Sequence, residues 1–87
     1  MEDACIGIHE QTDVAGVRRV AMRLASGLSF DDVSAGNVAL VVTEAAKNLL
    51  KHAGGGQVIL RRLEFNGAAG IEVLALVTGS TGPESVA

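Results

Sequence analysis

Residues 42–56, VTEAAKNLLKHAGGG, decide the fold of this chain, because they carry a helical pattern together with the end of the helix. Apolar residues recur at helical spacing up to and through this stretch, at Val38, Val41, Val42, Ala45 and Leu49. The glycines at 54–56 then end the helix, since glycine adopts the left-handed conformation at low cost. Upstream, the sequence SFDD at residues 29–32 resembles a capping box with Asp in place of Glu. A long helix is therefore predicted from Ser29 almost to Ala53.

A strand and a first helix are predicted before this long helix. In ACIGIH, residues 4–9, the alternation of Ala4, Ile6 and Ile8 indicates a short strand. Thr12 and Asp13 are N-cap residue types. After them the apolar residues recur at three and four positions, at Val14, Val17, Ala21 and Leu24. Ser26-Gly27 closes this first helix.

Two strands are predicted after the glycines, at residues 57–65 and 71–77, joined by a hairpin loop over residues 66–70. Residues 71–76 are apolar on both faces apart from Glu72, which is typical of a central strand. The order is β-α-α-β-β, an α+β fold with two helices on one face of a mostly antiparallel sheet. The packing residues are predicted to be Val14, Val17, Leu24, Val38, Val41, Ala45 and Leu49. Residues 78–87, TGSTGPESVA, are small and polar and are predicted to be a disordered tail.

The composition limits the function classes. The 87 residues allow one domain, and the net charge of −3 with only two aromatic residues, both Phe, argues against binding nucleic acid. Cys5 is the single cysteine, so no internal disulfide and no cysteine-based zinc site is expected. Without a long apolar run, and with an acidic rather than basic start, the chain is expected to be cytoplasmic and to avoid membranes.

The residues that could carry chemistry lie on the second helix. Spacings of four and three place Glu44, Asn48 and Lys51 in line on one helix face, with His52 beside them. An amide oxygen can ligate Mg²⁺, a carboxylate can orient or deprotonate a hydroxyl, and a lysine can neutralise phosphate. Taken alone, such a row is more often a solvated helix face.

The stretch from Val42 to Ala53 resembles the N-box of the GHKL superfamily, E-x-x-x-N followed by a Lys/His-Ala ending. The order of the flanking elements is similar to that of the bacterial anti-sigma-factor and stressosome switch serine/threonine protein kinases, over about Ile6 to Leu76. The resemblance implies a partial GHKL ATPase/kinase fold that binds ATP and Mg²⁺. Asn48 would hold the metal, and Glu44 would be the catalytic base or positioning carboxylate. Lys51 and His52 would lie near the phosphates or the lid.

The resemblance ends at residue 77. There the family carries a D-x-G-x-G motif whose Asp binds the adenine amino group, but this sequence has Val77, and only Gly79 matches a glycine of the motif. The lid and the second glycine-rich motif would lie beyond Ala87. Residues 1–77 are therefore expected to be a truncated GHKL kinase-like domain that binds ATP weakly and does not transfer phosphate.

Three functions remain in competition. The first is an ATP-dependent serine/threonine kinase domain of an anti-sigma or stress-response partner-switching system, present as an incomplete fragment whose partner is an antagonist or scaffold protein. The second is a non-catalytic partner-binding module derived from that fold. The third is a small α+β scaffold without that ancestry. The apolar strand at residues 71–77 also makes a homodimer through an exposed sheet edge a candidate assembly.

Overall fold

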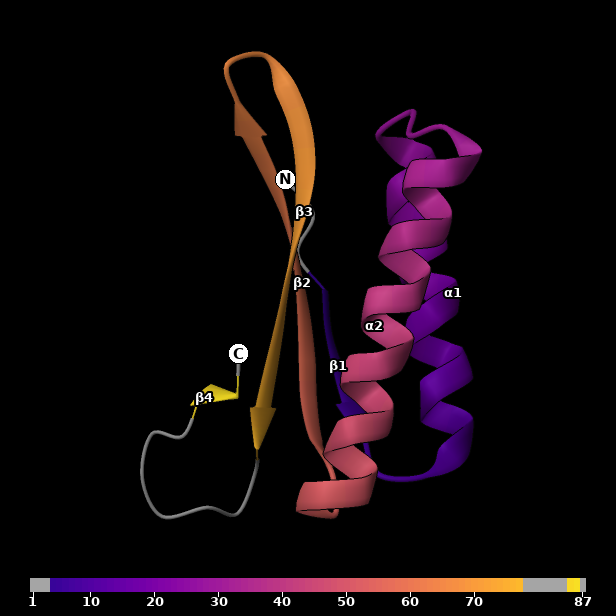
Figure 1. The fold of residues 1–87 in the computed structure, drawn as a ribbon, viewed down its shortest axis with the longest axis vertical. Helices are drawn as coiled ribbons and strands as arrows, with labels where there is room; N and C mark the ends of the chain where they lie inside the picture. The colour runs from indigo at the N-terminus through magenta and orange to yellow at the C-terminus, as the bar shows by residue number, and fades with distance from the viewer. Residues whose placement is uncertain (1–3, 78–84, 87) are drawn as a thin grey trace.

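The computed structural model describes residues 4–77 and 85–86 of the chain. The elements follow in the order β1 (Ala4–Ile8), α1 (Gln11–Gly27), α2 (Asp32–Ala53), β2 (Gly56–Phe65), β3 (Ala68–Val77) and β4 (Ser85–Val86). Figure 1 shows the two helices side by side as one layer and the sheet as the other. The predicted α+β class, with both helices on one face of an antiparallel sheet, is confirmed.

The sheet has the strand order β1-β2-β3-β4, and every neighbouring pair is antiparallel. β1 pairs along its length with the first half of β2, from Ile8 opposite Gly56 to Ala4 opposite Leu60. β3 pairs with all of β2 and, among the described residues, meets β4 only at Ala75 and Leu76, so the described part of β3 is flanked on both sides only near its C-terminal end. The predicted disordered tail, residues 78–87, lies outside the described residues except for β4.

The core lies between the helix layer and the sheet face that carries Ile8, Val58 and Leu60. All of its buried side chains are aliphatic: Ile8, Val14, Val17, Ala21, Val42, Ala46, Leu49, Val58 and Leu60. Leu24 and Val38 pack against this cluster while partly buried, as do the alternate β3 residues Ile71, Val73, Ala75 and Val77. The predicted packing residues are thus correct on α1, whereas on α2 Val38 and Leu49 belong to this cluster and Ala45 and Val41 do not.

Val41 is an exception, because 53% of it is exposed. The buried stripe of α2 instead follows Ala35, Ala39, Val42, Ala46 and Leu49. Both sets satisfy helical spacing, but the observed one places small alanines toward α1, whose buried residues include Ala21 and Ala25. Short side chains let the two helices approach closely while both lie on the sheet. The larger Val41 consequently faces solvent.

Both helices begin at a different cap from the one predicted. The N-cap of α2 is Asp31 rather than Ser29: its Oδ1 accepts from the backbone N–H of Ser34 at 2.7 Å. Ser29 instead has a left-handed backbone with φ of 62° in the link between the helices. The N-cap of α1 is Glu10 rather than Thr12 or Asp13. Asp13 lies in the first turn, where its Oδ2 accepts from the backbone N–H groups of His9 (2.8 Å) and Glu10 (3.1 Å).

The β2–β3 hairpin is tighter than predicted. Instead of a loop over residues 66–70, only Asn66 and Gly67 lie between the strands, with φ of 53° and 79°. Positive φ at both central positions is the geometry of a type I′ turn, for which Asn-Gly is a preferred sequence. The strands are therefore longer than predicted, and the tip of the hairpin splays away from the helix layer (Figure 1).

Candidate functional site

The candidate catalytic and binding residues lie on the exposed side of the C-terminal half of α2. Glu44, Asn48, Lys51 and His52 are all exposed. Glu44 forms a long ion pair, 4.0 Å from its Oε2 to the Nζ of Lys47 one turn later. Because both partners are largely in water, this pair contributes little to stability and leaves the Glu44 carboxylate free to reorient.

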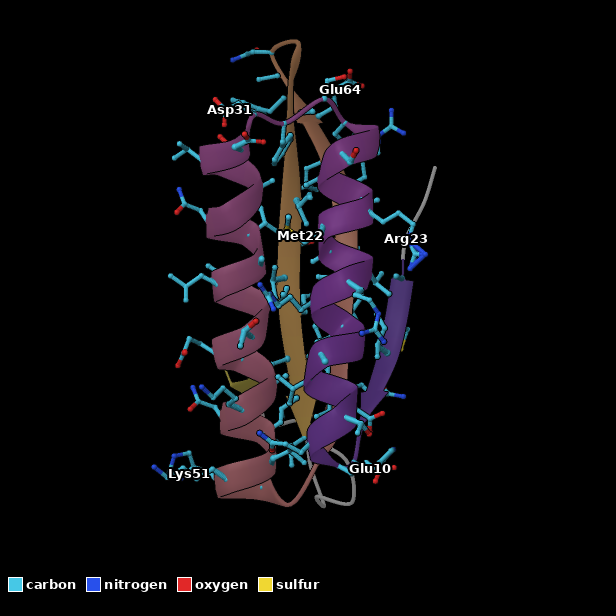
Figure 2. All side chains as sticks on the ribbon, turned by 90° about the vertical axis from the view of Figure 1, so that its right-hand side faces the viewer. Glu10, Met22, Arg23, Asp31, Lys51 and Glu64 are labelled. Carbon is cyan, nitrogen blue, oxygen red and sulfur yellow. The ribbon has the colours of Figure 1, made fainter. Side chains whose placement is uncertain are left out.

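Asn48 and His52 line a hollow of about 380 Å³ between the end of α2 and the end of β3. Its remaining lining is apolar: Ala45, Leu49 and Ala53 from α2, with Ala75 and Val77 from β3. Glu44 and Lys51 are not part of this lining. Figure 2 shows Lys51 at the C-terminal end of α2, extending outward from the molecule. The structure thus brings two of the four predicted residues into one concave site and leaves the other two on its outer side.

The three glycines after α2 fix the position of this hollow. Gly54 ends the helix with a left-handed φ of 73°, and the following turn donates from Gly55 N–H to the Leu49 carbonyl. A Cβ on Gly55 would lie 2.8 Å from the Ile8 carbonyl oxygen. A Cβ on Gly56 would collide with the Leu76 carbonyl oxygen and lie 2.9 Å from Leu49 Cδ2. The predicted helix stop is confirmed, and the glycines also allow the end of α2 to pack directly on β1 and β3.

The electrostatics at this end of α2 favour a cation. The carbonyl groups of a final helix turn carry partial negative charge, which Lys51 and His52 in that turn partly offset. An amide oxygen such as that of Asn48 is a ligand type that Mg²⁺ accepts. Within residues 4–77 and 85–86, no three His, Cys, Asp or Glu side chains gather as a metal site. Any metal held here would rely on Asn48, water and the oxygens of a bound ligand.

A second concave site lies at the other end of the helix layer, and no local sequence pattern indicates it. Arg23 and Arg62 line it together with apolar side chains of α1. Arginines alternating with apolar residues on a helix or strand are common on any solvated surface. Their convergence depends on how α1 packs on β1 beside β2, which only the tertiary structure reveals.

Among the described residues, no helix combines the length and apolar character needed to cross a lipid bilayer. This finding concerns the two helices α1 and α2.

Comparison with known proteins gives one distant similarity. The chain is 24% identical over 74 residues to the serine/threonine-protein kinase RsbT of Bacillus subtilis (strain 168). The alignment covers 85% of this chain but 56% of RsbT, so the chain spans about half the length of that relative. No protein-family model matches the sequence, and no solved structure matches it. The similarity supports a distant and partial relationship to a bacterial serine/threonine-protein kinase.

Proposed function

We propose that this chain carries the metal- and phosphate-binding half of an ATP-dependent serine/threonine-kinase domain from a cytoplasmic stress-response partner-switching system. One observation supports the proposal above the others. Asn48 and Val77 stand at two separate motif positions that the GHKL resemblance assigns to a single nucleotide site, and both line the hollow at the end of α2. The partial similarity to RsbT is consistent with that ancestry.

The proposed roles follow from the position of each side chain. Asn48 faces the hollow and would hold Mg²⁺, which would neutralise charge on the ATP phosphates. His52 lines the same hollow and would contact a phosphate. Glu44, one turn before Asn48, would turn from Lys47 toward the reacting hydroxyl and accept its proton. Lys51 would add positive charge at the edge of the site.

Val77 limits what the site achieves. Where the family resemblance expects a carboxylate that accepts the adenine amino N–H, valine offers no acceptor. An unpaired polar group in a binding site typically costs about 1–3 kcal/mol. We therefore expect this chain to bind Mg-ATP with at best millimolar affinity and to transfer no phosphate, since phosphoryl transfer depends on complete positioning.

Nuclear magnetic resonance titration of the ¹⁵N-labelled chain with Mg-ATP tests the proposal at this low affinity. We expect shifts confined to residues 45–53 and 75–77, and we expect Asn48→Ala to abolish their dependence on Mg²⁺. Asn37→Ala, at another exposed position on α2, is the matched control and should leave the shifts unchanged. Shifts spread over the whole surface would remove the support for a nucleotide site. A low-micromolar dissociation constant for Mg-ATP, measured by calorimetry, would instead refute the expected weak binding.

A non-catalytic partner-binding module is the second candidate, and Val77 is the observation that favours it. In that case millimolar Mg-ATP would leave residues 45–53 unshifted while a protein partner still binds. The partner in either case would be an antagonist or scaffold protein of the cascade. A homodimer through the outer edge of β3 is a further proposal, since in the part of the chain that the structure describes β4 pairs only with Ala75 and Leu76 of that strand. Sedimentation equilibrium of the chain measures whether it forms this dimer.

A further inference from the structure

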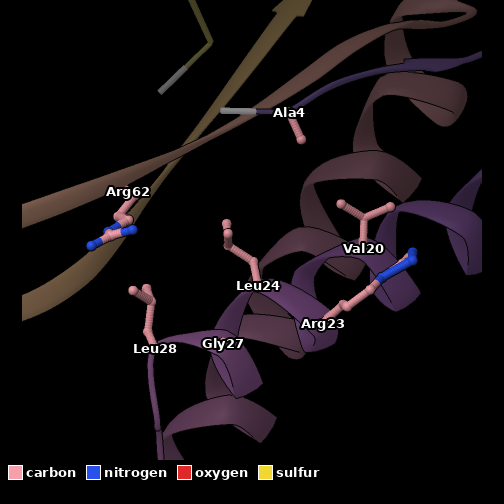
Figure 3. Close-up of a pocket in the computed structure, with 7 residues that line it drawn as sticks. All are labelled: Ala4, Val20, Arg23, Leu24, Gly27, Leu28 and Arg62. Atoms are coloured by element: carbon pink, nitrogen blue, oxygen red, sulfur yellow. The ribbon is translucent and has the colours of Figure 1, made fainter. Parts of the chain in front are cut away.

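The groove at the far end of the helix layer from Asn48 has the chemistry of a docking site. It measures about 340 Å³ and is lined by Ala4, Val20, Arg23, Leu24, Gly27, Leu28 and Arg62. Figure 3 shows Leu24 between Arg23 on one side and Arg62 on the other, with Leu28 beside it. The groove therefore has an aliphatic floor with a guanidinium group toward each end.

The charged side chains that line this groove are both positive. No carboxylate of the described residues lines it, and the ion pairs found among those residues join Lys47 to Glu44 and Arg61 to Glu72. Glu64 lies on the same face of β2 as Arg62 but does not line the groove. In a chain with a net charge of −3, two arginines without a carboxylate partner among the described residues favour an acidic ligand.

The edge of the sheet beside the groove favours a polypeptide over a small anion. β1 is the first strand of the sheet, so its outer edge has no strand partner among the described residues. Ala4, at the start of β1, is also part of the groove lining. An extended segment placed along β1 would bond to its backbone groups and direct alternate side chains toward Val20 and Leu24.

We propose that this groove and the adjoining edge of β1 dock an extended acidic segment of a partner protein that carries an aliphatic anchor side chain. The anchor packs on Leu24 and Leu28, and carboxylates on either side of it pair with Arg23 and Arg62. This inference goes beyond the proposed nucleotide site, because none of its residues lines the hollow at Asn48.

Fluorescence anisotropy with a labelled peptide of alternating glutamate and leucine tests the proposal on the full chain. We expect Arg23→Glu with Arg62→Glu to weaken binding about tenfold or more, since each exposed ion pair contributes up to about 1 kcal/mol. The matched control is Arg18→Glu with Arg19→Glu, which makes the same change in net charge on α1 outside the groove. It should change affinity less than twofold.

Two further measurements separate docking from general charge attraction. A peptide with glutamine in place of glutamate should bind at least tenfold more weakly. A peptide N-methylated at alternate residues should also lose binding, because it cannot pair with β1, whereas attraction to arginines alone would persist. Equal losses in both double variants, or undiminished binding of the glutamine peptide, would overturn the proposal.

The two proposals fail independently. The Arg23→Glu, Arg62→Glu variant should retain the Mg-ATP shifts at residues 45–53, and Asn48→Ala should retain peptide binding. Circular dichroism of each variant confirms that the fold is intact.

Discussion

Two aspartates fix where the helices begin, and their ionisation links the stability of the fold to pH. Hydrogen bonds from the backbone N–H groups of His9 and Glu10 lower the pKa of Asp13 below its ordinary value, and a hydrogen bond from the N–H of Ser34 lowers the pKa of Asp31 in the same way. A carboxyl group whose pKa is lower in the folded state stabilises the fold above its unfolded pKa and loses that contribution as the pH falls through its folded pKa.

We therefore expect thermal stability to be maintained at neutral pH and to decrease as the pH falls below about 4. Replacing Asp31 or Asp13 by asparagine should lower the melting temperature at pH 7 and flatten this acid dependence. Asp32→Asn is the matched control, since Asp32 lies in the first turn of α2 without accepting a backbone bond. Melting curves followed by circular dichroism from pH 7 to pH 2.5 measure both effects; an unchanged slope in Asp31→Asn would contradict the assignment of the cap.

The glycines provide a second prediction at the residue scale. Gly56→Ala should destabilise the fold by about 1–3 kcal/mol or more, because its Cβ has no room between Leu76 and Leu49. Gly36→Ala, in α2 with nothing near its Cβ, should instead stabilise by about 0.5–1 kcal/mol. Urea unfolding of both variants gives the free energies. If the two changes had the same sign, the tight packing of the end of α2 on β3 would be wrong.

At the scale of the element, two substitutions in α2 test whether the predicted or the observed apolar stripe of this helix packs in the core. Leu49 is 3% exposed, so Leu49→Ala should cost about 2–5 kcal/mol. Val41 is exposed, so Val41→Ala should change stability by no more than about 0.5 kcal/mol. The predicted stripe contained both residues, whereas the observed stripe contains Leu49 but not Val41. Equal losses of stability in the two variants would instead support the predicted stripe.

The same helix shows which features of the fold could be predicted from sequence patterns and which could not. The existence, type and order of the elements from β1 to β3 were predictable, because residue periodicity and the glycines at 54–56 specify them locally, whereas β4 lies in the predicted tail. The rotation of α2 was not predictable, since Val41 and Val42 are equally apolar and only contact with α1 selects one. The cap of α2 was misplaced because Ser29 and Asp31 are both residue types that cap helices, and the cap of α1 was misplaced because its N-cap, Glu10, is not a preferred type.

The candidate site was predictable to a similar degree. Helical spacing was enough to place Glu44, Asn48 and Lys51 on the exposed side of α2. The hollow that takes in Asn48 and His52 but omits Glu44 and Lys51 depends on where β3 ends. The groove between Arg23 and Arg62 joins residues of a helix and a strand far apart in the sequence, and no local pattern indicates such a meeting.

At the scale of the whole molecule, the two concave sites lie at opposite ends of the helix layer. The end of α2 and the end of β3 form the first, and the end of α1 forms the second with the start of β1 and with Arg62 of β2. Antiparallel helices of similar length place these two helix ends far apart (Figure 1). The arrangement leaves room for a nucleotide and a protein segment to occupy the same molecule at once.

The pairing of β1 with β2 also has a consequence for how the chain acquires its structure. β2 and β3 are joined by a two-residue turn and can pair as soon as both exist, whereas β1 must wait until two helices have been made before Ala4 meets Leu60. Closing so long a loop costs more entropy than closing a hairpin, which slows the step. During synthesis β1 emerges before the strand with which it pairs, so Ile6 and Ile8 have no sheet partner until β2 has been made. In that interval the apolar side of β1 is open to a chaperone.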